Sequence, residues 1–179
     1  SAVSDYREAL HQNPIERNNW HNMVLCLMEL ERYEEADLAL DSMMLLWPRE
    51  SSQCTMKAQV SLAKQDTVLA EEWVDSALVL NNYDGNAWSM KASMYINREE
   101  YKDAEAALDK AIVQKPRLTG LYINRALTRF QQNNIRGAMS DYDQAIDIDA
   151  NNYIAHHNRG LLRAQVGDDN RAIEDFDYV

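Results

Sequence analysis

Residues 122–150 read YINRALTRFQQNNIRGAMSDYDQAIDIDA, and this stretch decides the fold. Apolar residues recur three or four positions apart on both sides of the polar segment Gln132-Asn133-Asn134. This spacing is typical of two amphipathic helices joined by a tight turn. A shift equal to the interval between Ala104 and Ala138 carries the same pattern onto nearly all of the chain. The sequence therefore predicts an array of helical hairpins.

Small residues and prolines mark the repeat. The three prolines, Pro14, Pro48 and Pro116, share one column at the end of a unit, where proline stops a helix without the loss of a hydrogen bond. We expect helices at 17–30 and 33–46, with copies of this pair at 51–80, 85–114 and 119–148 and a partial copy from residue 153. One column of small residues holds Ala2, Ala36, Ala70, Ala104, Ala138 and Ala172.

Composition excludes several classes of protein. The 179 residues include only five glycines and three prolines, which disfavours a β-sandwich or barrel with many tight turns. The formal net charge of −11 repels nucleic acid and anionic lipid. No apolar run approaches the length of a membrane span. The two cysteines, Cys26 and Cys54, lack metal-ligand spacing, and we interpret them as small buried hydrophobes.

The repeat resembles the tetratricopeptide repeat, whose signature runs Trp, Leu-Gly, Tyr, Ala, Phe and Pro over about 34 residues. Trp20, Trp88 and Tyr122 stand in the signature tryptophan column. The small-residue column holds Ala58, Ala92, Ala126 and Gly160, and the late aromatic column holds Tyr6, Leu40, Leu108, Tyr142 and Phe176. The resemblance covers essentially the whole chain and implies an all-α fold, a right-handed α-solenoid of helix-turn-helix repeats.

We expect one array over residues 1–179. Its complete repeats are 17–50, 51–84, 85–118 and 119–152, preceded by the second helix of a truncated repeat at 1–16 and followed by a nearly complete fifth repeat at 153–179. Ile173, Phe176 and Val179 would leave an apolar stripe facing solvent. We interpret the chain as a fragment of a longer array of the bacterial multi-repeat type. Its compartment is open, because a fragment would have lost an export signal.

We find no pattern that predicts an enzyme, a metal site or a cofactor. His156 and His157 diverge on a helix and cannot share an ion. The acidic run Asp141, Asp143, Asp147 and Asp149 lacks the glycine and glutamate of a calcium loop and fits a solvated helix face.

A column of cations replaces the signature leucine, at Lys57, Lys91, Arg125 and Arg159. It could be a basic ladder for an acidic ligand. Alternatively it is structural, because Asp141 and Asp175 follow Arg125 and Arg159 at one constant offset, and we favour ion pairs between these residues. No aspartate stands at this offset after Lys57 or Lys91, and we expect these lysines to extend their ammonium groups to solvent.

The first helix of each unit should line a concave groove that holds almost no charge. Amide and hydroxyl groups mixed with Met and Leu suit an extended or helical peptide, so we expect a protein-binding scaffold. Alternatives are an empty groove, or a spacer that self-associates through its ends. No partner can be named, and neither nucleic acid nor membrane insertion is expected. The candidate groove residues are Asn18, His21, Asn22, Leu25, Thr55, Met56, Gln59, Ser89, Met90, Ser93, Ile123, Asn124, Leu127, His157, Asn158 and Leu161.

Overall fold

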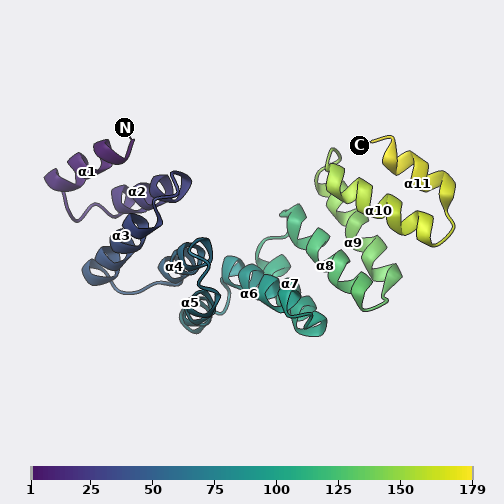
Figure 1. The fold of residues 1–179 in the computed structure, drawn as a ribbon, viewed down its shortest axis with the longest axis horizontal. Coiled ribbons are helices and arrows are strands. Elements are labelled where there is room, and N and C mark those ends of the chain that lie inside the picture. The colour runs from purple at the N-terminus through teal and green to yellow at the C-terminus, as the bar shows by residue number, and fades with distance from the viewer. Residues whose placement is uncertain (1, 179) are drawn as a thin grey trace. The chain divides into compact units, whose positions relative to one another are not determined.

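A computed structural model describes residues 2–178, which form eleven α-helices and no strand (Figure 1). The helices pair as the sequence repeat predicts, and each predicted helix lies within about two residues of an observed one. Their bounds are α1 Ala2–Gln12, α2 Arg17–Glu29, α3 Tyr33–Leu46, α4 Ser51–Ala63, α5 Thr67–Leu80, α6 Gly85–Asn97, α7 Tyr101–Gln114, α8 Thr119–Gln131, α9 Ile135–Ile148, α10 Tyr153–Gln165 and α11 Asp169–Phe176.

The helices form two compact units, residues 1–87 and 88–179. In the first unit each helix from α1 to α5 packs on the next, and in the second unit the same holds from α7 to α11. The predicted all-α class of helix-turn-helix repeats is confirmed. That residues 1–179 form one array stays a prediction.

The alanine column is the seam of each hairpin. Ala36, Ala70, Ala104 and Ala138 have no exposed surface, and Ala172 is 2% exposed. A methyl group lets neighbouring helix backbones approach closely, whereas a larger side chain at a fully packed position would force them apart. The column therefore fixes where the helices meet.

The turn inside each hairpin is set by one residue with positive φ. These residues recur at the same position of each repeat as Glu31, Gln65, Glu99, Asn133 and Gly167, with φ from 56° to 82°. The left-handed conformation ends the preceding helix. Glycine adopts this conformation without strain, and among these five turns only the last has glycine, at Gly167. The turns predicted at 132–134 and 167–169 are confirmed, and the other three turns use a residue type that no turn signal marks.

Two further predictions concern burial. Cys54 is fully buried, and burial is the main cause that raises the pKa of its thiol, but Cys26 is partly exposed, contrary to the prediction. In the predicted apolar stripe, Ile173 is 58% and Phe176 36% exposed, while Val179 lies outside the described residues.

The strained turns give a stability test. Gln65→Gly should raise the free energy of unfolding by about 0.5 to 1 kcal/mol, because the left-handed strain of about 1–2 kcal/mol that glycine removes at φ 64° exceeds its entropic cost of about 0.5–1 kcal/mol. Urea unfolding followed by circular dichroism measures the change. The matched control is Lys64→Gly in the same turn, where φ is −80° and glycine should destabilise. Equal effects of the two glycines would contradict the assignment.

Candidate functional site

The cation column lies between helices, and the predicted ion pairs are confirmed. The Arg125 guanidinium on α8 donates to Asp141 on α9, with a shortest N–O distance of 2.6 Å. Arg159 on α10 donates to Asp175 on α11 at 2.5 Å. Both aspartates are only 2% exposed, so the arginines satisfy carboxylates that would otherwise be buried without a partner.

Each of these arginines also binds a second carboxylate, on the helix that precedes its own. Arg125 donates to Asp109 on α7 at 2.6 Å, and Arg159 donates to Asp143 on α9 at 2.7 Å. The second carboxylate precedes the cation by the same offset at which the first follows it. The guanidinium group thus joins three consecutive helices. Arg129 and Arg163, one turn further along α8 and α10, add contacts at 2.8 Å to Asp141 and Asp175.

Lys57 follows the same rule, so the prediction that it reaches solvent is wrong. Its side chain is 5% exposed, and its ammonium group lies 2.6 Å from Asp41 and 2.5 Å from Asp37. Asp41 precedes Lys57 by the offset that separates Asp109 from Arg125. The signal was present in the sequence, because Asp41, Asp109 and Asp143 are themselves one column of the repeat. The predicted ion pairs considered only carboxylates that follow the cation along the chain, whereas Asp41 precedes it.

Two other predictions for charged side chains are also wrong. Lys91 is 8% exposed, so it is buried and does not extend into solvent. Asp141 is 2% exposed and departs from the predicted solvated helix face. Asp141 lies where α8 and α9 pack, which the pattern of one helix alone does not reveal.

The network shifts the ionisation of its members. Burial acts to raise the pKa of Asp175, but hydrogen bonds from Arg159 and His156 and the nearby charges of Arg159 and Arg163 lower it overall. Burial acts to lower the pKa of Arg125, and its bonds to Asp141 and Asp109 raise it overall. The charged forms are therefore the stable ones, and the column serves packing, which leaves it unavailable as a ladder for a ligand.

The sixteen candidate groove residues differ in exposure. Three are buried, which are Thr55, Met56 and Ile123, and the Thr55 hydroxyl donates to the Ser52 carbonyl at 2.8 Å. The half-buried residues are Ser89, Met90, Asn124 and Asn158. The exposed residues are Asn18, His21, Asn22, Leu25, Gln59, Ser93, Leu127, His157 and Leu161.

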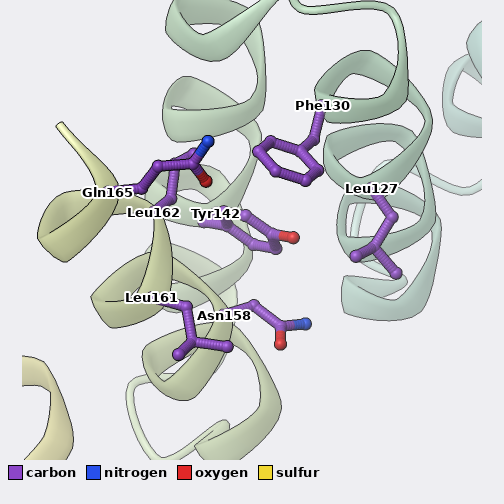
Figure 2. Close-up of a pocket in the computed structure, with 7 residues that line it drawn as sticks. All are labelled: Leu127, Phe130, Tyr142, Asn158, Leu161, Leu162 and Gln165. Carbon is purple, nitrogen blue, oxygen red and sulfur yellow. The ribbon is translucent and has the colours of Figure 1, made fainter.

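Three of these candidates meet in one pocket of about 220 Å³ in the second unit, which we call the α8–α10 pocket. Leu127 and Phe130 come from α8, Tyr142 from α9, and Asn158, Leu161, Leu162 and Gln165 from α10. Figure 2 shows the side chains of α8 and α10 directed toward one another across the Tyr142 ring. Their register explains this, since residues at equivalent positions of the repeat occupy equivalent places on adjacent first helices.

The α8–α10 pocket is apolar and uncharged. Leu127 and Leu161 are 42% and 52% exposed at its mouth, whereas Leu162 and Tyr142 are 3% and 2% exposed. Burial is the main cause that raises the pKa of Tyr142 to about 12, and it outweighs the hydrogen bond with Asn158, which acts to lower it. The phenol therefore stays neutral at physiological pH, and the two amides, Asn158 and Gln165, are the polar groups available to a ligand.

Sequence reasoning missed the other four residues of the pocket. Phe130, Leu162 and Gln165 lie on the first helices but outside the face that we assigned to the groove, and Tyr142 was placed only in the aromatic packing column. The signal that could have indicated the pocket is the aromatic column of the second helices, because Tyr142 of α9 lies between the first helices α8 and α10.

A metal site and a membrane-spanning helix are both absent from residues 2–178. In this part of the chain, no group of three or more His, Cys, Asp or Glu side chains is arranged to hold a metal ion. None of its helices has the length and apolar character needed to cross a membrane.

The buried network predicts a pH-dependent stability. Asp175→Asn should lower the free energy of unfolding at pH 7 by on the order of 3 kcal/mol, because it removes one member of a buried charge cluster. Since the folded state lowers the pKa of Asp175, the stabilisation is complete above the unfolded value of about 3.9 and is lost as pH falls through the lower folded value. Urea titrations of both proteins between pH 7 and pH 3 measure the difference.

The control for this prediction is Glu174→Gln, which neutralises an exposed neighbour on α11 and should change stability by less than about 0.5 kcal/mol at any pH in this range. A difference between wild type and Asp175→Asn that stays constant down to pH 3 would show that the carboxylate charge does not stabilise the fold.

Comparison with known proteins points to one family. The family model described as TPR repeat matches residues 126–167, and the model described as tetratricopeptide repeat matches residues 85–116. No curated protein matches the sequence.

Solved structures resemble the chain in fold. PilF of Pseudomonas aeruginosa has a TM-score of 0.81 at 15% identity, over 99% of this chain and 77% of that one. MamA from Desulfovibrio magneticus RS-1 has a TM-score of 0.75 at 18% identity, over 88% and 89% of the two chains. YrrB, a TPR protein with an unusual peptide-binding site, has a TM-score of 0.64 at 20% identity, over 88% and 81%. The two family models identify tetratricopeptide repeats at residues 85–116 and 126–167, and the solved structures show that the chain shares the fold of tetratricopeptide repeat proteins.

Proposed function

We propose that the protein is a peptide-binding scaffold, and that the α8–α10 pocket receives an apolar side chain of a partner protein. The observation that carries the proposal is an uncharged apolar pocket with amide groups at its mouth, on a chain whose net charge is −11. Tetratricopeptide repeats generally act as scaffolds for protein interactions and are generally not catalytic.

The size of the α8–α10 pocket favours a side chain over a cofactor. Its volume of about 220 Å³ lies below the roughly 300–1,000 Å³ of pockets that enclose small molecules. A single leucine, methionine or phenylalanine side chain would bury its surface against Leu127, Leu161 and Phe130. Burial of one such side chain contributes about 1.5–3 kcal/mol.

The amides favour a peptide as the ligand. Asn158 and Gln165 each offer a carbonyl acceptor and an N–H₂ donor, the groups that pair with a peptide backbone. They lie two helical turns apart on α10 and therefore on the same face of that helix. A segment that places its apolar side chain between them would have backbone groups within reach of both, whether it is extended or helical.

The pocket depends on residues that differ between repeats. At the position of Asn158 the helix α4 has Met56, which is 8% exposed, and at the position of Leu161 it has Gln59. Met90 on α6 shares this column with Met56, whereas Asn22 on α2 and Asn124 on α8 carry asparagine, so the fold accepts either residue there.

The solved structures add a precedent and no more. YrrB is described as having an unusual peptide-binding site, and it shares this fold at 20% identity. The proposal rests on the lining residues of this chain.

The test is peptide display against the full chain, with variants copied from its own repeats. Peptides enriched on the wild type should share an apolar residue, and they should bind Asn158→Met at least about tenfold more weakly, because the longer methionine side chain, which this column already accepts at Met56 and Met90, would occupy the pocket. Leu161→Gln, which copies Gln59, should weaken binding through loss of apolar contact. Fluorescence anisotropy with labelled peptides measures both affinities.

The control is Ser93→Ala on α6, an exposed candidate residue that does not line the pocket. It should leave the affinity of these peptides unchanged. Enriched peptides that bind Asn158→Met as tightly as the wild type would disprove the pocket as the site.

A further inference from the structure

A second apolar opening lies in the first unit, between α1 and α3, and we call it the α1–α3 groove. Its floor is α2, which packs against both helices (Figure 1). Its volume is about 230 Å³. The lining residues are Arg7 from α1, Trp20, Met23 and Leu27 from α2, and Glu35, Leu38, Ala39 and Ser42 from α3.

In the second unit, the equivalent grooves between second helices are filled by the charge network. Between α7 and α9, Arg125 on α8 reaches both Asp109 and Asp141. Between α9 and α11, Arg159 on α10 reaches both Asp143 and Asp175.

The groove between α3 and α5 is filled in a similar way. There Lys57 on α4 binds Asp41 and lies 5.8 Å from the centre of the Trp73 ring. In each of these three places a long cation occupies the space between two second helices.

The α1–α3 groove lacks a cation at the equivalent position. Met23 stands in the column of Lys57, Arg125 and Arg159, and Arg7 stands in the column of their aspartates. Arg7 pairs instead with Glu35, which Arg32 also contacts at 2.6 Å. The floor is therefore apolar, since Met23, Leu27 and Ala39 are 6%, 1% and 5% exposed and carry no charge.

The surface beside the groove carries apolar residues where the fold requires none. On α3, Leu38, Asp41 and Leu45 follow one another at intervals of three and four, and the leucines are 66% and 88% exposed. The column of Leu38 holds Glu72, Ala106 and Ser140 in later hairpins, so its exposed leucine is particular to α3, whereas the column of Leu45 holds Val79, Val113 and Asp147. Leu38 and Leu45 lie two turns apart on one face of α3, where a second helix can pack against both.

Charge indicates the kind of helix. Residues 1–87 hold 6 basic and 15 acidic side chains, a net charge of −9. On α3 the exposed Glu34 and the 57% exposed side chain of Asp41 lie along or beside the leucine stripe. A basic helix is attracted to this surface and an acidic one is repelled.

We propose that the α1–α3 groove, with Leu38 and Leu45 of α3, binds a basic amphipathic helix of a partner protein, which inserts one apolar side chain over Met23 and Leu27. This surface is separate from the α8–α10 pocket and uses none of its residues.

The probe is a synthetic helix-forming peptide with leucines spaced three and four apart, a central phenylalanine, and lysine and arginine elsewhere. Two control peptides replace the basic residues by glutamate or the phenylalanine by alanine. Anisotropy titrations with the full chain should show binding of the first peptide, no binding of the acidic one, and at least about tenfold weaker binding of the alanine peptide. The affinity should fall as salt rises.

The decisive variant is Arg7→Asp combined with Met23→Arg. It installs the ion pair that Asp109 and Arg125 form, and so fills the groove with an arrangement that this chain already folds around. The double substitution makes the protein one charge more negative, so non-specific attraction of a basic peptide would increase. We expect binding to fall at least about tenfold instead. Circular dichroism establishes that the variant is folded.

A second variant covers the case in which the double variant does not fold. Leu38→Ser copies Ser140 at an exposed position and should weaken binding about fivefold, whereas Val113→Ser, which removes a 73% exposed apolar side chain from the column of Leu45 on α7, should leave it unchanged. The proposal is overturned if the acidic peptide binds as well as the basic one. It is equally overturned if a folded Arg7→Asp/Met23→Arg protein, or Leu38→Ser, binds the basic peptide as tightly as the wild type.

Discussion

The structure depends on burial between neighbouring hairpins, because a single pair of helices leaves one apolar face in water. The core of the first unit shows this directly. Val3 of α1, Leu27 of α2, Leu40 of α3 and Val60 of α4 belong to one buried cluster, although the repeat boundaries fall between them. The second unit has the same organisation, with Tyr142 and Leu162 in a cluster that spans α8 to α10. Because neighbouring hairpins share their core residues, the position of each hairpin constrains the register of the next.

A charge buried between packed helices is destabilising unless it is paired. In this chain the pairing is a repeated arrangement of one arginine with two carboxylates. Arg125 and Arg159 each contact two carboxylates on two other helices, and at least one of the two is buried. Such a group contributes more to the choice of one register than to net stability, since an apolar residue of similar volume would pack there as well. A helix shifted by one turn would leave a buried aspartate without its cation, and this penalty opposes slippage in a structure of nearly identical units.

The sequence predicted those features that depend on one repeated column of residues. It did not predict contacts that join residues of different columns on different helices. The alanine seam and the helix bounds follow from spacing alone, and so do the bonds from Arg125 to Asp141 and from Arg159 to Asp175. The ion pair between Lys57 and Asp41 did not follow, because its carboxylate lies on the preceding helix and not on the following one. The left-handed turns at Glu31, Gln65 and Glu99 carry no residue signal, since the strain is imposed by the packed helices on either side. The α8–α10 pocket is formed by side chains of three helices. The exposed face of the first helices predicted three of its residues, but the buried Tyr142 of α9 could not be found from that face.

The two openings arise from opposite kinds of substitution in a fixed frame. Asn158 has Met56 and Met90 as its equivalents on α4 and α6, and it lines the space between the first helices α8 and α10. At Met23 an apolar residue stands where other repeats have a cation, and the network that fills the space between second helices is absent. Neither change disturbs the alanine seam, which lies elsewhere in each hairpin. The alanine seam is the same in every hairpin, while these two columns accept residues of different chemistry, as Met23 and Arg125 or Met56 and Asn158 show, so both openings lie at columns that vary between repeats.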